Sequence, residues 1–187
     1  VRARYLQALG REVDFPEDGY RGDYVTDMGE QLAGDEGDKY ADMPDTDETA
    51  HFFFQMFEDE IIQQAREDLA EFGIEFDVWF TEQSLYDTGA VAEEIENLRE
   101  MDMAYDKEGA VWLKTEEFGD DQDRVLVRSN GNPTYIASDA AYAANKFSRG
   151  FDHVIYCFGP DHAGYVPRLR AVLAACGFDL DRVEMVV

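Results

Sequence analysis

The stretch DHVIYCFGPDHAGYVPRLRAVLAACG, residues 152–177, places an apolar run before a short turn and a second, periodic apolar segment. The continuous run over 152–158 predicts a buried strand, and the spacing of apolar residues over 166–177 predicts a helix. Residues 181–187 predict a further strand. A strand–helix–strand order with an apolar first strand indicates parallel strands that are covered on both faces. We therefore expect this end of the chain to form half of a doubly wound α/β domain.

The turn between the strand and the helix carries side chains that a turn alone does not require. Gly159 allows a ligand to approach the backbone closely, and the next residues with ionisable side chains are Asp161 and His162. In open α/β sheets, ligands bind beyond the carboxyl ends of the strands, where this turn should lie. Asp161 could cap a helix or accept hydrogen bonds from ribose hydroxyls, and His162 could contact a polar substrate. The spacing alone leaves the structural and the ligand-binding interpretation open.

A second pair of candidate residues lies in PTYIASD, residues 133–139. Tyr135 and Asp139 are four residues apart, so on a helix they share one face. A phenol beside a carboxylate makes a selective seat for a cation such as guanidinium, because the carboxylate can bind it bidentately and the ring can pack on it. The alternative is a helix-capping aspartate and a core tyrosine.

The first part of the chain is predicted to be rich in helices. The most regular segment, residues 47–72, has apolar residues near a period of 3.6, a Thr and an Asp at its start, and Gly73 after its end. The other expected helices span residues 1–10, 24–34, 90–102 and 139–150. A short strand is expected at 74–80, a loop at 81–89, and a small antiparallel patch over 103–130, where hairpin and tight-turn signals occur.

Composition limits the class of partner and the compartment. The 187 residues carry 42 acidic and 16 basic side chains, a net charge of −26 at pH 7, which opposes a broad nucleic-acid-binding face. Cys157 and Cys176 show no paired spacing, which favours two reduced, buried thiols over a disulfide or a metal site. With no signal peptide and no long apolar run, the sequence is typical of a cytoplasmic protein.

Three quoted motifs carry a resemblance to a known family. RARYLQALG with FPEDGYRGDY, then FGIEFDVWFTEQSLYDTG, then the run from GDDQDRVLVRSNGNPTYIASD through FGPDHAGYVPRLRAVLAACGFD occur in that order. Together they resemble the middle of bacterial-type arginyl-tRNA synthetase. The resemblance implies an α/β fold with a partial Rossmann-type parallel sheet and a small antiparallel insertion. It divides the chain into a helix-rich first part (1–82), an inserted connective module (83–130) and an α/β half of the catalytic domain (131–187).

The resemblance also implies a reaction and a set of binding residues. The family joins arginine to ATP with release of pyrophosphate, then transfers the arginine to tRNA(Arg). On the matching motifs, Tyr135, Asp139 and His162 would bind arginine, and Gly159, Asp161 and His162 would bind ATP. The ATP is expected as its magnesium complex, with no metal bound by the chain's own residues and no prosthetic group.

The two ATP-handling signatures of that family, a His-x-Gly-His helix start and a Lys-Met-Ser-Lys-type loop, do not occur in this sequence. They are expected before Val1 and after Val187. No catalytic residue is therefore expected within the 187 residues, and the fragment alone should form no adenylate and bind tRNA weakly. The family also commonly has Ala at Pro160 and a second His at Ala163, a difference that concerns the His162 contacts and not the Tyr135 and Asp139 pair.

Two further readings stay open at this point. One is another class I-like nucleotidyl transferase, which would select a different substrate. The other is an acidic, non-catalytic module derived from a synthetase, which would serve as a partner-binding protein. A reading frame that extends this sequence and contains both missing signatures would favour the enzyme.

Overall fold

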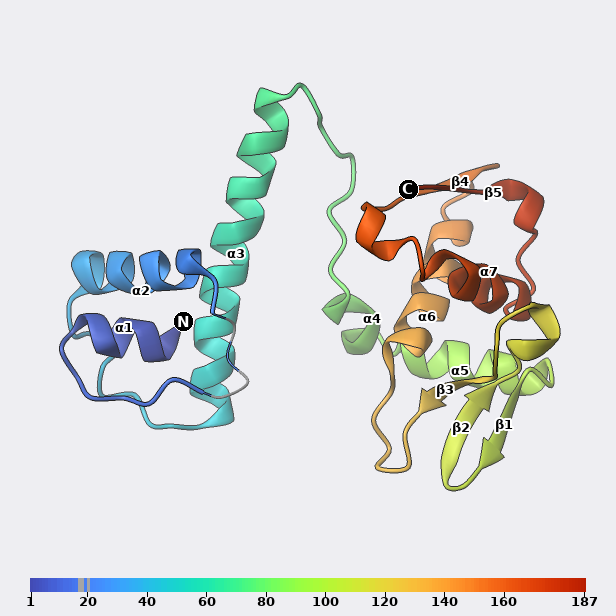
Figure 1. The fold of residues 1–187 in the computed structure, drawn as a ribbon, viewed down its shortest axis with the longest axis horizontal. Helices are drawn as coiled ribbons and strands as arrows, with labels where there is room; N and C mark the ends of the chain where they lie inside the picture. The colour runs from blue at the N-terminus through green and yellow to red at the C-terminus, as the bar shows by residue number, and fades with distance from the viewer. Residues whose placement is uncertain (17–18, 20) are drawn as a thin grey trace. The chain divides into compact units, whose positions relative to one another are not determined.

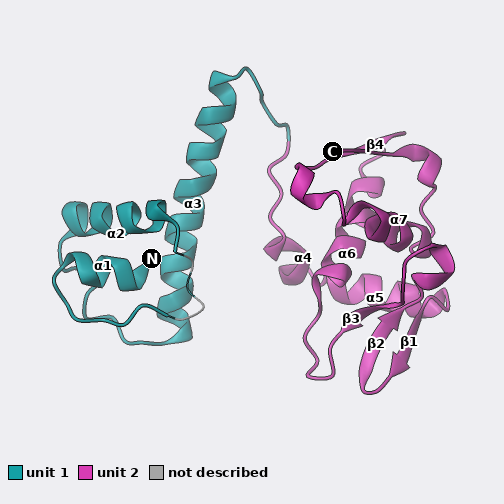
Figure 2. Ribbon diagram, in the orientation of Figure 1, with its two compact units in different colours: residues 1–77 teal, residues 78–187 magenta. Residues whose placement is uncertain are grey.

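The computed structural model describes residues 1–16, 19 and 21–187, and it divides into two compact units, Val1–Asp77 and Val78–Val187 (Figure 2). Residues 17, 18 and 20 belong to the quoted motif FPEDGYRGDY and lie outside the described residues. The expected three-part division into catalytic and inserted segments stays a prediction.

The first unit is built from helices, as the sequence predicts. They are α1 (Arg2–Ala8), α2 (Asp23–Glu36) and the long α3 (Asp47–Glu71) (Figure 1). Helix α3 begins where its first turn is capped, because the Thr46 side chain accepts a hydrogen bond from the Thr49 backbone N–H at 3.3 Å.

The core of the first unit is centred on a buried tyrosine of α1. Tyr5 is fully buried beside Phe53 of α3, with the two ring centroids 5.9 Å apart. Its hydroxyl donates to the Gly37 carbonyl at 2.7 Å and accepts from the Tyr40 N–H at 3.1 Å. Both hydrogen-bonding functions of the phenol are thus satisfied inside the unit, which ties α1 to the segment after α2.

The segment that spans the end of the first unit and the start of the second requires a correction to the predicted elements. Residues 74–80, all of which are described, form no strand, and Ile74, Phe76 and Val78 are exposed there. The alternation of apolar residues in this segment therefore does not mark a buried sheet face. The expected loop at 81–89 contains a short helix, α4 (Gln83–Asp87), whose Leu85 is buried.

The middle of the second unit agrees with the prediction of a helix followed by an antiparallel patch. Helix α5 (Ala90–Glu100) precedes a three-stranded antiparallel sheet in the order β1-β2-β3. The strands are β1 (Ala104–Lys107), β2 (Ala110–Leu113) and β3 (Arg124–Val127), with a 3₁₀ turn, η1 (Glu116–Phe118), before the last of them.

The last part of the unit has the predicted α/β order. Helix α6 (Tyr135–Ser148) starts earlier than expected and precedes β4 (Val154–Cys157). After a 3₁₀ turn, η2 (Pro160–His162), come α7 (Val166–Ala175), η3 (Leu180–Arg182) and β5 (Val183–Val186). Strands β4 and β5 are parallel, with Val154 paired to Val183 and Cys157 to Val186.

Both flanking helices of this parallel pair lie on the same face of the two strands. Ala143 of α6 and Leu173 of α7 join one buried cluster with Val154 and Tyr156 of β4. On the opposite face, Ile155 is 56 % exposed. The prediction of a strand covered on both faces is therefore wrong for the described structure, because α6 and α7 supply one layer only.

That same face corrects the prediction for the cysteines. Cys157 is exposed and Cys176 is buried, and both are free thiols.

Among the helices of the described residues, none combines the length and the apolar character that crossing a membrane requires.

The crossing of α1 and α2 leaves no room for a side chain at Gly29. A Cβ atom placed there would lie 2.6 Å from Arg4 Cβ and 2.7 Å from the Tyr5 backbone nitrogen. We expect Gly29→Ala to destabilise the first unit by about 1–3 kcal/mol, because the helices would have to move apart. Amide hydrogen exchange of α1 and α2 measures this effect in the unit concerned.

The matched control is Gly34→Ala on the same helix, where the added Cβ would meet nothing within 4 Å. At residue 34, the higher helix propensity of alanine should raise the free energy of opening of α2 by up to about 1 kcal/mol. Amide exchange in α2 should therefore become slower. Equal effects of the two substitutions would contradict the close crossing.

Candidate functional site

The start of α6 is fixed to the antiparallel sheet by the residue that precedes the helix. The Thr134 backbone N–H donates to the Leu126 carbonyl at 2.8 Å, and the Thr134 hydroxyl donates to the Val125 carbonyl at 2.6 Å. Thr134 is buried, so these bonds are shielded from water. Tyr135 and Asp139, in the first two turns of α6, take their positions from this attachment.

Asp139 faces a small hollow in the second unit. The hollow has a volume of about 190 Å³ and is lined by Phe80, Glu82, Leu85, Ser138, Asp139 and Tyr142. Asp139 is only partly exposed, and it accepts a hydrogen bond through Oδ2 from the Tyr165 hydroxyl. It lies in the second turn of α6 and bonds to the residue that precedes α7, so it does not cap its own helix.

The electrostatics of Asp139 follow from this half-buried position. Burial raises the pKa of the Asp139 carboxyl above its ordinary value, and the nearby Glu82 carboxylate acts in the same direction. The hydrogen bond from Tyr165 and the positive charge of Lys146 act in the opposite direction. A cation that entered the hollow would stabilise both carboxylates by charge attraction.

Lys146 occupies an aromatic setting one helical turn beyond the hollow. Its ammonium nitrogen lies 3.7 Å from the centroid of the Tyr142 ring and 4.1 Å from that of Tyr156. Burial lowers the pKa of Lys146 to about 8, although the Asp139 charge opposes this shift. The rings hold the ammonium group by cation–π contacts.

Tyr135 is exposed rather than part of the core, with 53 % of its surface accessible. Its phenol oxygen accepts a hydrogen bond from Arg168 Nη1 of α7 at 2.8 Å. Its ring centroid lies 5.8 Å from that of Tyr165. The two residues predicted to share a face of α6 are thus both in contact with residues at the start of α7.

The turn after β4 forms a second group of candidate residues. His162 Nδ1 lies 3.3 Å from Asp161 Oδ1, and the His162 ring stacks on Phe158 with centroids 5.7 Å apart. The side chains of Asp161 and His162 are 78 % and 55 % exposed. Asp161 caps neither η2 nor α7 with its side chain, so the capping role considered for it is not realised.

Gly159 provides space for the Asp161 carboxylate. A Cβ atom at residue 159 would lie 2.5 Å from Asp161 Oδ1, whereas the backbone angle φ there is −70°, which any residue can adopt. A side chain at residue 159 would therefore require the exposed Asp161 carboxylate to move, whereas the backbone conformation itself does not require glycine. The two candidate groups are joined through Tyr165, whose backbone N–H donates to the His162 carbonyl at 2.8 Å. Among the described residues, no side-chain hydrogen bond or ion pair joins Asp161 or His162 to Tyr135 or Asp139.

Sequence reasoning missed four residues of this site: Glu82, Lys146, Tyr165 and Arg168. Lys146 could have been found, because Tyr135, Asp139, Tyr142 and Lys146 follow a helical period. The other three come from segments far away in sequence, and only the fold brings them to α6. In the part of the chain that the structure describes, no three His, Cys, Asp or Glu side chains are grouped to hold a metal ion.

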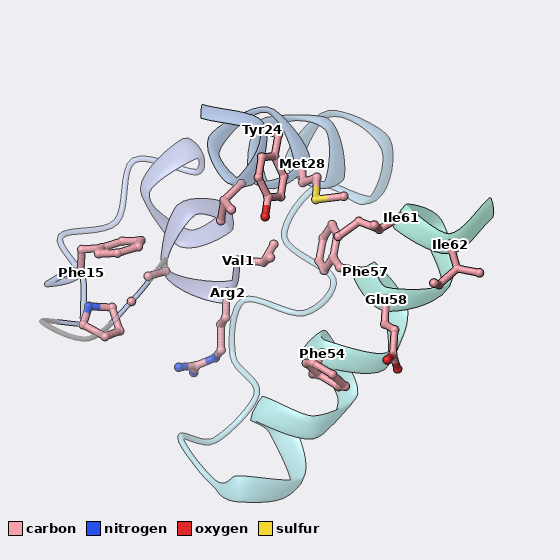
Figure 3. Close-up of a pocket in the computed structure, with 14 residues that line it drawn as sticks. Val1, Arg2, Phe15, Tyr24, Met28, Phe54, Phe57, Glu58, Ile61 and Ile62 are labelled. Carbon is pink, nitrogen blue, oxygen red and sulfur yellow. The ribbon is translucent and has the colours of Figure 1, made fainter. Parts of the chain in front are cut away.

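The first unit contains a larger groove with a different character. Its volume is about 480 Å³, and Tyr24 and Met28 of α2 face Phe57 and Ile61 of α3 across it (Figure 3). Among its described lining residues, the charged side chains are Arg2 and Glu58. This apolar lining offers little chemistry, so the candidate site is assigned to the second unit.

Comparison with known proteins places these residues in a family. Residues 20–186 match the model of the catalytic domain of class I tRNA synthetases for arginine, described as "tRNA synthetases class I (R), catalytic domain". The arginine–tRNA ligase of Syntrophotalea carbinolica is 46 % identical over 184 residues, which are 98 % of this chain and 33 % of that protein. The arginine–tRNA ligase of Desulforudis audaxviator is 45 % identical over 187 residues, 100 % of this chain and 33 % of that protein.

A solved structure shows the same similarity in three dimensions. A crystal structure named as an arginyl-tRNA synthetase of Campylobacter jejuni superposes with a TM-score of 0.82 at 30 % sequence identity, over 98 % of this chain and 42 % of that one. The chain therefore spans about a third of the length of the curated relatives it matches. It belongs to the class I arginyl-tRNA synthetase family and corresponds to part of its catalytic domain.

Proposed function

We propose that the protein to which this chain belongs is an arginine–tRNA ligase, which activates arginine with ATP and transfers it to tRNA(Arg) in protein synthesis. The observation that carries the proposal is the hollow lined by Asp139 and Glu82, in a chain of the arginine-specific family. Two carboxylates around a small hollow favour a cationic side chain as the ligand. Because the chain belongs to the arginine-specific family, we assign the cationic ligand as arginine and not as another amino acid.

The guanidinium group of arginine suits this hollow better than an ammonium group does. It is planar, carries five N–H donors and binds carboxylate oxygens in parallel pairs. In the proposed complex, Asp139 accepts from two of these donors and Tyr135 accepts one with its phenol oxygen. His162 is proposed to contact the polar, backbone end of the amino acid from the turn after β4.

ATP is proposed to bind at the same turn. The exposed Asp161 carboxylate is available to the ribose hydroxyls of adenosine, and Gly159 leaves the backbone accessible beside it. The turn lies at the carboxyl end of β4, where nucleotides bind in doubly wound sheets. The nucleotide is proposed to arrive as its magnesium complex, and no prosthetic group is invoked.

Transfer RNA is the third proposed partner, and most of its contacts are assigned outside this chain. A net charge of −26 repels a polyanion, so the 187 residues supply at most a small part of the tRNA surface. The proposed location of the protein is the cytoplasm, where its three substrates meet.

Removal of the Asp139 charge tests the arginine seat. In the full-length protein from the gene that contains this sequence, we expect Asp139→Asn to raise the arginine KM by about 100-fold, because a half-buried charge pair is lost. Tyr135→Phe should raise it by about 5–10-fold through the loss of one hydrogen bond. Steady-state aminoacylation with arginine and ATP varied separately measures both constants.

Asp161→Asn provides the matched comparison, since it makes the same chemical change in the other group of candidate residues. It should raise the ATP KM by about 10-fold and affect the arginine KM less. An unchanged arginine KM in the Asp139→Asn protein would contradict the proposed seat.

The 187-residue chain itself is expected to be inactive. It lacks both ATP-handling signatures, which stabilise the charge that develops on the transferring phosphoryl group. We expect arginine-dependent pyrophosphate exchange by the purified chain to stay at background, and its binding to tRNA(Arg) to be weak. Exchange above background would refute this assignment, with the full-length protein as the positive control.

A further inference from the structure

We propose that the start of α7 positions the arginine seat on α6, with Tyr165, which directly precedes the helix, and Arg168, in its first turn, as the two positioning residues. This inference rests on the proposed function, because the seat is defined by the arginine it would bind. The roles suggested by the family resemblance concern Tyr135, Asp139 and His162, and they leave the residues behind these side chains unassigned.

The first positioning contact is the hydrogen bond that the Tyr165 hydroxyl donates to Asp139 Oδ2. Tyr165 directly precedes α7, and its backbone N–H is bonded to the His162 carbonyl at 2.8 Å. Its ring packs against both hydrophobic clusters of the second unit. The Tyr165 side chain is therefore held in place by the backbone hydrogen bond and by the packing of its ring. Its hydroxyl in turn restricts the motion of the Asp139 carboxylate.

This hydrogen bond leaves Asp139 able to bind a guanidinium group. An ionised carboxylate offers about four acceptor positions, and Tyr165 uses one of them. A carboxylate with one oxygen anchored has lost part of its rotational freedom before the substrate arrives. The substrate then meets an acceptor whose orientation is already fixed, which strengthens binding without a new contact.

The second positioning contact is the hydrogen bond that Arg168 donates from Nη1 to the Tyr135 phenol oxygen at 2.8 Å. The Arg168 guanidinium carbon lies 5.7 Å from the centroid of the Tyr165 ring, so the two positioning residues also contact each other. The Arg168 Nε atom is buried, so part of this side chain is shielded from water. Arg168 fixes the direction of the Tyr135 phenol while one acceptor position on its oxygen remains.

The groups that face Asp139 determine how the arginine seat depends on pH. Glu82, from the segment before α4, and Lys146, from α6, supply opposite charges, and Tyr165, directly before α7, supplies the hydrogen bond. The Tyr165 bond lowers the pKa of Asp139, against the larger effect of burial. Its loss would therefore raise that pKa further, and arginine binding, which needs the ionised carboxylate, would fail at a higher pH on the acid side.

The test is Tyr165→Phe in the full-length protein, a change that keeps the ring and removes the donor. We expect the arginine KM to rise about 10-fold, while kcat and the ATP KM change less than about twofold. The acid limb of the profile of 1/KM for arginine against pH should move to higher pH. Arg168→Met should raise the arginine KM about 5-fold and leave the acid limb in place, because Arg168 acts on Tyr135.

Tyr105→Phe is the matched control. The Tyr105 hydroxyl donates to Asp123 Oδ2 at 2.7 Å in the antiparallel sheet, so the same kind of bond is removed away from the seat. This variant should leave the arginine KM and the pH profile unchanged.

Two results would overturn the inference. One is a Tyr165→Phe protein with an unchanged arginine KM and acid limb. The other is a parallel rise in the arginine KM and the ATP KM together with a lower melting temperature, which would indicate a structural role only. Failure of the proposed function would look different, since Asp139→Asn itself would then leave the arginine KM unchanged.

Discussion

The partial burial of one carboxylate, Asp139, is the constraint on which the proposed arginine seat in the second unit depends. A charged group out of water is costly unless it is hydrogen-bonded or paired, and here a single phenol, Tyr165, and a more distant cation, Lys146, provide the compensation. The compensation is incomplete, because burial still raises the pKa of Asp139. An incompletely compensated carboxylate beside a hollow binds a cation more strongly than an exposed one does.

Several parts of the fold together determine the position of this carboxylate. The antiparallel sheet fixes the start of α6 through Thr134, and α6 presents Asp139 in its second turn. The turn after β4 ends at Tyr165, which connects the proposed nucleotide side to the proposed amino-acid side. The antiparallel sheet and the α/β part that follows it thus both position residues of the proposed arginine seat. The acidic surface of the chain adds a field that favours a cationic substrate over a polyanionic one.

Local patterns in the sequence predicted most of the elements and half of the site. The i, i+4 spacing placed Tyr135 and Asp139 on one face, and the apolar run predicted β4 and its parallel partner. The alternation over 74–80 was misleading, because strand patterns describe burial only where a partner strand and a second layer exist. Glu82, Tyr165 and Arg168 could not be assigned, since their roles come from tertiary contacts between segments with no local signal. The roles proposed for Tyr135, Asp139, Gly159, Asp161 and His162 remain predictions.

A structure of the full-length protein with bound arginine tests the central claim most directly. The account predicts a guanidinium nitrogen about 2.7–2.9 Å from an Asp139 carboxylate oxygen, with the Tyr165 hydroxyl still bonded to Oδ2. It also predicts that the Glu82 carboxylate, which lines the same hollow as Asp139, lies beside the bound guanidinium group. A guanidinium group bound elsewhere, with Asp139 bonded to Tyr165 alone, would contradict it.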